Sequence, residues 1–314
     1  MEAVRMIKIG LVQSRATVEP EDNIRRTMAA IRAVAARGAQ IVSTQELFCS
    51  RYFCQHEDAR YFDLAEPIPG PTTKKLQDLA RELQVVIVGS LFEERAAGLY
   101  HNTAVIIDAD GALLGTYRKM HIPDDPGFSE KYYFAPGDQG FRVWNTRYAR
   151  LGVLVCWDQW FPEAARLTAM QGAEILFYPT AIGWLPGERD EGGLKFLDAW
   201  RTIQRSHAIA NGCYVAAVNR VGREEGGEAS GFIDFWGGSF VADPLGQVVA
   251  EASMDDEQSL IASIDLGQIT TARIEWPFFR DRRIDAYHGL TQRLLDQRPS
   301  RVDAGVRDPS SPTD

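Results

Sequence analysis

The stretch LGVLVCWDQWFPEAAR, from Leu151 to Arg166, passes from a run of apolar residues into the start of a helix. The apolar run predicts a buried strand over 151–156, and Pro162 suits the first position of the helix that follows. Cys156 stands at the last position of the run, where the chain must turn. A cysteine that only filled the core would fit within the run, so this position makes Cys156 a candidate nucleophile.

Strands and helices alternate on both sides of this stretch. The segment IKIGLVQS predicts a buried strand, and a helix is expected from Pro20 to the residue before Gly38. The further elements that we expect are strand 40–47, helix 72–84, strand 85–92, a hairpin at 110–111, helix 162–171, strand 174–182, helix 193–211, strand 214–222, a hairpin at 244–246 and strand 259–266. This alternation, with two interior hairpins, predicts mixed sheets covered by helices, an α/β sandwich.

The composition is that of an ordinary globular chain. Of its 314 residues, 45% are apolar and 25% are charged, which is enough to bury a large core. No linker-like segment interrupts residues 6–295, so we predict one domain over 1–296, followed by a disordered Pro- and Ser-rich tail over 297–314. The formal net charge of −9, without a basic stripe, argues against a nucleic-acid partner.

Location and redox state follow from the termini and the cysteines. Arg5 and Lys8 interrupt the first apolar residues, so no signal-peptide core is expected, and no apolar run approaches the roughly 20 residues that span a bilayer. Four cysteines in a chain of this length do not indicate a disulfide scaffold. We therefore predict a cytoplasmic protein with no membrane partner, in which a thiol stays reduced.

Three side chains with complementary chemistry stand at the ends of predicted strands: Glu46 in QIVSTQEL, Lys119 in the hairpin strand LLGTYRK (113–119) and Cys156 in LGVLVC. Ligands gather at the carboxyl ends of strands in open α/β sheets. A thiol needs a base to become a thiolate, and attack on an amide carbonyl creates an oxyanion that needs positive charge or fixed donors. Together they indicate carbon–nitrogen bond hydrolysis through a thioester-like intermediate. Taken singly, each also has a structural interpretation: an inert core thiol, a surface lysine and a locally paired carboxylate.

Other kinds of site find little support in the sequence. Cys49 and Cys54 are five residues apart, with no second cysteine pair or neighbouring histidine cluster, which argues against zinc. Neither a C-x-x-C motif nor a phosphate-binding glycine loop is present. We therefore predict no metal and no cofactor. Two alternatives from other classes are a metal-dependent phosphohydrolase on a similar sandwich and a catalytically silent binding protein.

Three blocks carry a resemblance to a known family: QELF at Glu46, YRKMHIPDDPGFSEKYYFAPGD at Lys119 and LVCWDQWFPEAAR at Cys156. They resemble, in order, the signature blocks of the nitrilase superfamily of carbon–nitrogen hydrolases, and the resemblance extends from about residue 6 to residue 294. It implies a four-layer αββα sandwich and a Glu–Lys–Cys triad. Glu46 would then be the general base, Cys156 the nucleophile and Lys119 the stabiliser of the tetrahedral intermediate.

The same resemblance implies two further roles at the site. The backbone N–H of Trp157 would stand beside Lys119 in the oxyanion hole. Glu130, in GFSEKYYF, matches a second glutamate that the superfamily places against the lysine and the substrate. A purely structural ion pair with Lys119 is the other interpretation of Glu130, and the two roles can coexist.

Within the superfamily, CWDQWFPEAAR and ELFCSRYFCQ are most similar to N-carbamoylputrescine amidases, which implies conversion of that compound and water to putrescine, CO2 and ammonia. Related hydrolases of carbamoyl amino acids carry an arginine shortly after the nucleophile, where this chain has Gln159 and Trp160. Because an arginine fork is the natural partner of a carboxylate, its absence counts against an acidic carbamoyl substrate, and nearby carboxylates could meet a cationic amine. The predicted substrate contacts are Tyr52, Asp124, Asp125, Trp184 and Glu188.

One segment departs from the subfamily pattern. After EILFYPTAI the plant-like members read AIGSEP, whereas this chain reads AIGWLPGERDEGG, so Trp184 and Leu185 replace a Ser-Glu pair. An activity similar to that of beta-ureidopropionases or omega-amidases is therefore the alternative. The resemblance also implies a homo-oligomer, dimeric or larger, that uses WPFFRDRRIDAY (276–287) at an interface.

Overall fold

The structure, a computed structural model, describes residues 4–226 and 231–295. The chain divides into two compact units, Met1–Phe278 and Phe279–Asp314, which are treated separately. The described part of the second unit contains two short 3-10 helices, η4 (Ile284–Ala286) and η5 (His288–Thr291). The predicted disordered tail, 297–314, lies outside the described residues, and one domain over 1–296 stays a prediction.

The first unit is built on two six-stranded sheets with matching designs. The first has the order β15-β1-β2-β3-β4-β5 and the second β14-β13-β10-β8-β7-β6. In each sheet the three central parallel strands are flanked by antiparallel ones. The bounds in the first sheet are β1 Met6–Gln13, β2 Ile41–Thr44, β3 Val86–Ala96, β4 Leu99–Ile107, β5 Leu113–Arg118 and β15 Gln258–Asp265. Those in the second are β6 Val143–Asn145, β7 Arg150–Val153, β8 Ile175–Pro179, β10 Tyr214–Val218, β13 Phe240–Ala242 and β14 Val248–Glu251.

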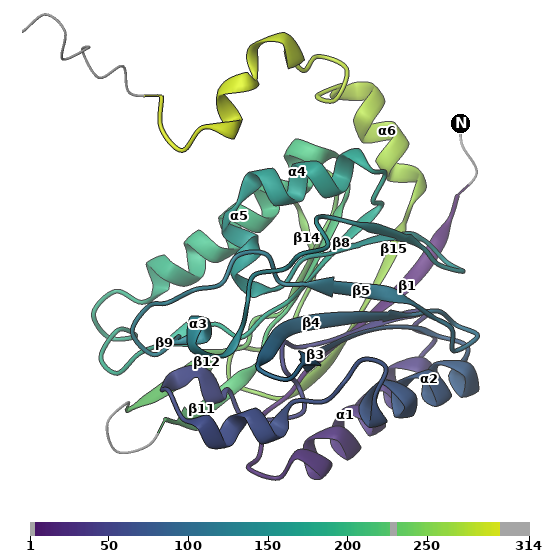
Figure 1. Ribbon diagram of the computed structural model, residues 1–314. Helices are drawn as coiled ribbons and strands as arrows, with labels where there is room; N and C mark the ends of the chain where they lie inside the picture. The colour runs from purple at the N-terminus through teal and green to yellow at the C-terminus, as the bar shows by residue number, and fades with distance from the viewer. Residues whose placement is uncertain (1–3, 227–230, 296–314) are drawn as a thin grey trace, which may run out of the picture. The chain divides into compact units, whose positions relative to one another are not determined.

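Helices cover the outer face of each sheet, so the first unit has four layers in the order αββα (Figure 1). Helices α1 (Pro20–Ala36) and α2 (Pro71–Leu83) pack on the first sheet, and α4 (Pro162–Met170) and α5 (Leu194–Asn211) pack on the second. The predicted sandwich is confirmed. None of the helices within the described ranges is long and apolar enough to cross a bilayer.

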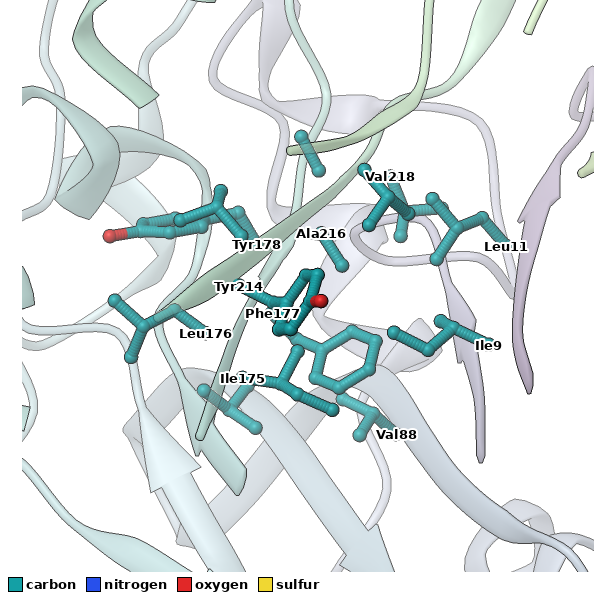
Figure 2. Close-up of a cluster of buried hydrophobic side chains, with 14 of the residues drawn as sticks. Ile9, Leu11, Val88, Ile175, Leu176, Phe177, Tyr178, Tyr214, Ala216 and Val218 are labelled. Atoms are coloured by element: carbon teal, nitrogen blue, oxygen red, sulfur yellow. The ribbon is translucent and has the colours of Figure 1, made fainter. Parts of the chain in front are cut away.

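Side chains on the inner strands alternate between two cores, as the period of two along a strand requires. On β3, Val86 and Val88 belong to the core between the sheets, whereas Ile87 belongs to the core beneath α1 and α2. Figure 2 shows the central core from within, with Phe177 of β8 directed at Ile9 of β1 and at Val88. Because both faces are buried, these strands read as continuous apolar runs.

Two predicted strands end earlier than expected, and both ends matter for the site. The strand predicted over 40–47 ends at Thr44, and the one predicted over 151–156 ends at Val153. The chain turns sharply just beyond each end, because Leu47 has φ +48° and Cys156 has φ +41°. Glu46 and Cys156 therefore lie in turns that follow the strands.

Several short elements escaped the sequence analysis. The hairpin of β11 (Val221–Glu225) and β12 (Phe232–Trp236) pairs with the two-residue strand β9 (Gly183–Trp184) in a third sheet. A last helix, α6, spans Gly267–Glu275. The two residues of β9 are too few for a periodic signal, and β11 (VGREE) lacks the continuous apolar run that marks the equally short inner strands.

Candidate active site

Glu46 lies directly beyond β2, and its side chain is fully buried. Its Oε1 accepts hydrogen bonds from Nζ of Lys119 at 2.9 Å and from Nδ2 of Asn102 at 2.7 Å. Within the described chain, its Oε2 is buried and accepts no hydrogen bond. One oxygen is thus fixed, while the other keeps the lone pairs that a proton acceptor needs.

Lys119 directly follows β5 and is also fully buried. Its ammonium contacts two carboxylates, Glu46 and Glu130, and reaches Oε2 of Glu130 at 2.7 Å. Burial alone would lower the pKa of this lysine, but the charges of Glu130 and Glu46 raise that pKa well above its ordinary value. The side chain therefore stays an ammonium and supplies a fixed positive charge.

Glu130 begins the single-turn helix α3 (Glu130–Tyr133) and is fully buried. Burial raises the pKa of its carboxyl to about 7, an effect that Lys119 opposes and Glu46 reinforces. The hydroxyl of Tyr52 donates to its Oε1 at 2.6 Å. Glu130 is thus held from two sides, by an ammonium and by a phenol.

Cys156 opens the 3-10 helix η3 (Cys156–Trp160) with its backbone in the left-handed region, at φ +41°. A non-glycine residue holds that conformation only where its surroundings fix it, and such residues cluster at functional sites. The Sγ atom lies 3.8 Å from the carbonyl oxygen of Ala181. Burial, followed by the charge of Glu46, raises the pKa of the thiol well above its ordinary value, so deprotonation requires a nearby base.

The carboxylate of Asp158 accepts hydrogen bonds from both the turn that carries Cys156 and the segment around Lys119. Its Oδ2 accepts from the backbone N–H of Val155 at 3.0 Å and from the hydroxyl of Tyr117 at 2.7 Å. Its Oδ1 accepts from the backbone N–H of His121 at 3.0 Å and lies 2.6 Å from that ring's Nδ1. Tyr117 and His121 flank Lys119, so one buried carboxylate sets the position of Cys156 relative to the ammonium.

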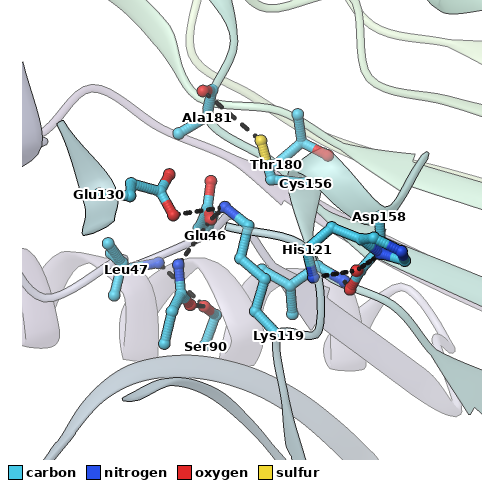
Figure 3. A network of polar contacts seen from close by, with 12 residues as sticks. Glu46, Leu47, Ser90, Lys119, His121, Glu130, Cys156, Asp158, Thr180 and Ala181 are labelled. Atoms are coloured by element: carbon cyan, nitrogen blue, oxygen red, sulfur yellow. Dashed lines mark hydrogen bonds and ion pairs between the residues drawn. The ribbon is translucent and has the colours of Figure 1, made fainter. Parts of the chain in front are cut away.

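Figure 3 shows the outcome of these contacts: Glu46, Lys119, Glu130 and Cys156 converge on one space. Glu46, Lys119 and Cys156 come from segments far apart in the sequence, which follow β2, β5 and β7, and Glu130 begins α3. The structure thus brings together the three residues that the sequence singled out, with Glu130 beside them.

A cavity of about 440 Å³ opens beside Cys156 and Glu130. Its lining residues are Pro123, Asp125, Pro126, Phe128, Glu130, Cys156, Trp157, Trp160, Ala181, Ile182, Gly183, Leu185, Glu188, Phe196 and Trp236. These include three carboxylates and five aromatic rings but, among the described residues, no lysine, arginine or histidine. A cavity of this composition suits a cation and gives a carboxylate no charged partner.

Two of the predicted substrate contacts, Asp125 and Glu188, line this cavity. Glu188 is held in place because its Oε2 accepts from the backbone N–H of Leu185 at 2.8 Å. Asp124 is exposed and lies outside the lining. Tyr52 is buried behind Glu130, to which it donates, and does not line the cavity either.

The departure from the subfamily pattern also takes a definite form. Trp184 is buried, donates its indole N–H to the carbonyl oxygen of Gly193 at 2.9 Å and lies outside the lining, whereas Leu185 faces the cavity. Of the two positions where related hydrolases carry arginine, Gln159 is fully buried and accepts from the indole of Trp200 at 2.8 Å. Of these two residues, Trp160 lines the cavity and Gln159 does not.

Sequence reasoning missed three residues that support the site. Asn102 lies within β4 and donates to Glu46, Asp158 anchors the cysteine turn, and Arg220 donates to the backbone oxygen of Glu46 at 2.9 Å. Asp158 had a detectable signal, as a charged residue two positions after the cysteine in an apolar stretch. Asn102 and Arg220 had none, because their partners lie far along the chain. The described residues contain no group of three or more His, Cys, Asp or Glu placed to hold a metal ion, and metal independence stays a prediction.

Comparison with known proteins decides the family. The model named Carbon-nitrogen hydrolase matches residues 8–274. The chain belongs to the carbon–nitrogen hydrolase family. It is accordingly an amidohydrolase of the nitrilase superfamily that acts on carbon–nitrogen bonds other than peptide bonds.

Relatives of this carbon–nitrogen hydrolase cover almost all of it. An N-carbamoylputrescine amidase of Solanum lycopersicum is 47% identical over 92% of this chain and 96% of its own length. A citrullinase of Francisella tularensis is 41% identical over 91% of this chain and 99% of its own length. The crystal structure of a carbon–nitrogen hydrolase from Helicobacter pylori G27 superposes with a TM-score of 0.88 at 47% identity, covering 92% of this chain and all of that one.

The substitution Asp158→Asn tests the anchoring of the cysteine turn. It replaces one acceptor oxygen by an NH2 group that cannot accept from the N–H donors facing it, so the free energy of unfolding should fall by about 2 kcal/mol. Urea unfolding followed by circular dichroism measures this loss. Glu94→Gln, at an exposed carboxylate on β3, is the matched control and should change it by less than about 0.5 kcal/mol. Equal effects of the two substitutions would contradict the anchoring role.

Proposed function

We propose that this hydrolase cleaves N-carbamoyl amines through Cys156, with N-carbamoylputrescine as the preferred substrate. The observation that carries the proposal is the cavity beside Cys156, whose described lining offers carboxylates and aromatic rings but no basic side chain. The products would be putrescine, CO2 and ammonia. The 47% identity to a tomato N-carbamoylputrescine amidase supports the same substrate.

In the first half-reaction, the unpartnered Oε2 of Glu46 takes the proton of the Cys156 thiol as Sγ attacks the carbamoyl carbon. The carbonyl oxygen becomes an oxyanion, which the Lys119 ammonium and the backbone N–H of Trp157 stabilise. Glu46 then returns the proton to the terminal nitrogen, the C–N bond breaks and ammonia leaves. An N-alkylcarbamoyl thioester remains on Cys156.

In the second half-reaction, Glu46 activates a water molecule that attacks the thioester carbon. A second oxyanion forms at the same donors and collapses with release of the Cys156 thiol, which recovers its proton from Glu46. The freed N-alkylcarbamic acid loses CO2 in solution and gives the amine. The ion pair with Glu130 keeps Lys119 charged and in place through both steps.

The distal ammonium of the substrate is recognised by acidic and aromatic residues of the cavity lining. Asp125 and Glu188 supply negative charge there, and Trp157, Trp160 and Trp236 supply ring faces that attract a cation. Leu185 places an apolar wall against the methylene chain. The preference for a cationic substrate therefore comes from the cavity lining, whereas the bond cleavage depends on Glu46, Lys119 and Cys156.

A second candidate is a ureido amino acid such as citrulline, favoured by the 41% identity to a citrullinase. Its α-ammonium could use the same carboxylates, but its α-carboxylate would meet Asp125 or Glu188 without an arginine to balance it. Activities similar to those of beta-ureidopropionases and omega-amidases face the same difficulty, because their substrates also carry a carboxylate.

A substrate panel tests the proposal. The kcat/KM for N-carbamoylputrescine should exceed that for N-carbamoyl-β-alanine by at least about 100-fold, because a carboxylate placed against Asp125 or Glu188 meets like-charge repulsion that can cost several kcal/mol. The kcat/KM values for citrulline and for the uncharged N-butylurea should lie between these two values. Ammonia release by the wild type, with Cys156→Ala as the inactive control, gives each value.

Two variants test whether Glu188 is responsible for the preference for N-carbamoylputrescine over N-carbamoyl-β-alanine. Glu188→Gln should reduce the preference for N-carbamoylputrescine by about 10-fold. Asp124→Asn, at an exposed carboxylate outside the cavity lining, should leave it unchanged. A higher kcat/KM for citrulline or N-butylurea would instead identify a different ureido hydrolase of the same superfamily.

We also propose that the protein is a cytoplasmic homo-oligomer that uses the segment 276–287. In and beside that segment, Ile274 is 73% exposed, Trp276 57% and Ile284 73%, an unusual density of bare apolar side chains. Analytical ultracentrifugation should show a dimer or larger species that Trp276→Glu weakens. If the wild type and the Trp276→Glu variant were both monomeric at micromolar concentration, the proposed oligomer would be contradicted.

A further inference from the structure

Arg220 is a fully buried arginine outside the triad, located between β10 and β11. Its Nη2 donates to the backbone oxygens of Glu46 at 2.9 Å and Leu47 at 3.0 Å. Its Nη1 donates to the backbone oxygen of Ser50 at 3.0 Å and to Oε1 of Glu224 at 2.7 Å. Three of these four hydrogen bonds thus hold the turn that carries Glu46.

The turn that carries Glu46 has a strained backbone and is held by hydrogen bonds on both sides. Leu47 has φ +48°, a conformation that a leucine adopts only where several contacts fix it. The guanidinium of Arg220 donates to the carbonyl oxygen of Leu47, and the hydroxyl of Ser90 accepts from the backbone N–H of Leu47 at 3.0 Å. Without the guanidinium, three buried carbonyl oxygens would lose a charged donor, and the backbone of Glu46 would gain freedom.

Arg220 is also linked to the catalytic side chains by a second route. The carboxylate of Glu224 accepts from Arg220 and, with Oε2, from the backbone N–H of Tyr52 at 2.7 Å. Tyr52 then donates its hydroxyl to Glu130, which pairs with Lys119. Since Lys119 also contacts Glu46, the contacts close into a ring of six buried residues: Arg220, Glu224, Tyr52, Glu130, Lys119 and Glu46.

We propose that Arg220 is a positioning residue for the proton acceptor of this hydrolase. It fixes the backbone of Glu46 so that the free carboxylate oxygen is presented to Cys156, and through Glu224 and Tyr52 it fixes Glu130 against Lys119. This inference rests on the function proposed above. Arg220 does not line the substrate cavity, and its guanidinium contacts these hydrogen-bond partners and the ring of Phe235, so it acts on the reaction only through other residues.

A purely structural role makes a different prediction. If Arg220 only stabilised the fold, its replacement would lower the melting temperature but leave the folded enzyme with its normal kcat. A positioning role requires a fall in kcat at nearly constant KM, because the base acts on the thiol and not on the distal end of the substrate. It also requires slower alkylation of Cys156, since the thiol then loses its proton less readily.

The experiment compares Arg220→Lys and Arg220→Met with Gln13→Ala. Lysine keeps the charge, but its single nitrogen has three donors and cannot satisfy four acceptors; methionine removes the charge as well. Gln13 is a matched control because it is equally buried and makes four side-chain hydrogen bonds, to Ser239, Ser253 and Asp256, away from the triad. The readouts are kcat, KM, the rate of iodoacetamide labelling at Cys156 by peptide mass spectrometry, and the melting temperature.

We expect both Arg220 variants to lose about 10- to 100-fold in kcat with KM within about threefold of wild type. Labelling of Cys156 should slow in parallel. Gln13→Ala should lose thermal stability while keeping kcat and the labelling rate within about twofold. A folded Arg220→Lys protein with wild-type kcat, or with normal labelling of Cys156, would overturn the inference.

A milder variant covers the case in which neither Arg220 variant folds. Glu224→Asp keeps the charge but shortens the side chain, so the carboxylate can no longer reach both Arg220 and the N–H of Tyr52. The same loss of kcat and of labelling is expected there, and unchanged values would overturn the inference. Turnover by Cys156→Ala would refute the proposed function itself, whereas an inactive Cys156→Ala beside a fully active Arg220→Lys would refute the positioning role alone.

Discussion

The buried ammonium of Lys119, held between Glu46 and Glu130, is the interaction on which the other features of the site depend. A buried lysine without partners would lose its proton, because burial lowers the pKa of an amine. Here the two carboxylates reverse that effect and hold the pKa well above its ordinary value. The positive charge is therefore present in the resting protein, before any oxyanion exists, and stabilising that oxyanion requires little reorganisation.

The same arrangement explains why the base and the thiol differ in their surroundings. Lys119 and Asn102 occupy one oxygen of Glu46, so only the other oxygen can take a proton. Burial and the charge of Glu46 raise the pKa of Cys156, so the thiol loses its proton only where a base is at hand. The ring of contacts holds three carboxylates, Glu46, Glu130 and Glu224, against two cations. Burial raises the pKa of Glu130 to about 7, and the negative charge of Glu46 adds to this rise while Lys119 opposes it.

The extent to which sequence could anticipate this structure depended on the range of each interaction. Continuous apolar runs and proline- or glycine-bounded helices predicted the sandwich, because strands buried on both faces and capped helices leave local signals. Glu46, Lys119 and Cys156 stood out because each lies at the end of a predicted strand. Arg220 did not, since its contact with the oxygen of Glu46 spans 174 residues and belongs to no periodic pattern. Trp184 was expected at the substrate, but its indole is turned to the carbonyl oxygen of Gly193, a choice made by loop packing that residue type alone does not reveal.

In the proposed mechanism Cys156, with Glu46 as its base and Lys119 as the fixed positive charge, forms a covalent intermediate with the carbon of the scissile bond. Rapid acid quench during turnover of N-carbamoylputrescine, followed by intact-protein and peptide mass spectrometry, tests this most directly. A transient adduct is expected on the peptide that contains Cys156, with the mass of the substrate less one ammonia. Undiminished turnover with no adduct at any quench time, or an adduct confined to Cys49, Cys54 or Cys213, would contradict this mechanism.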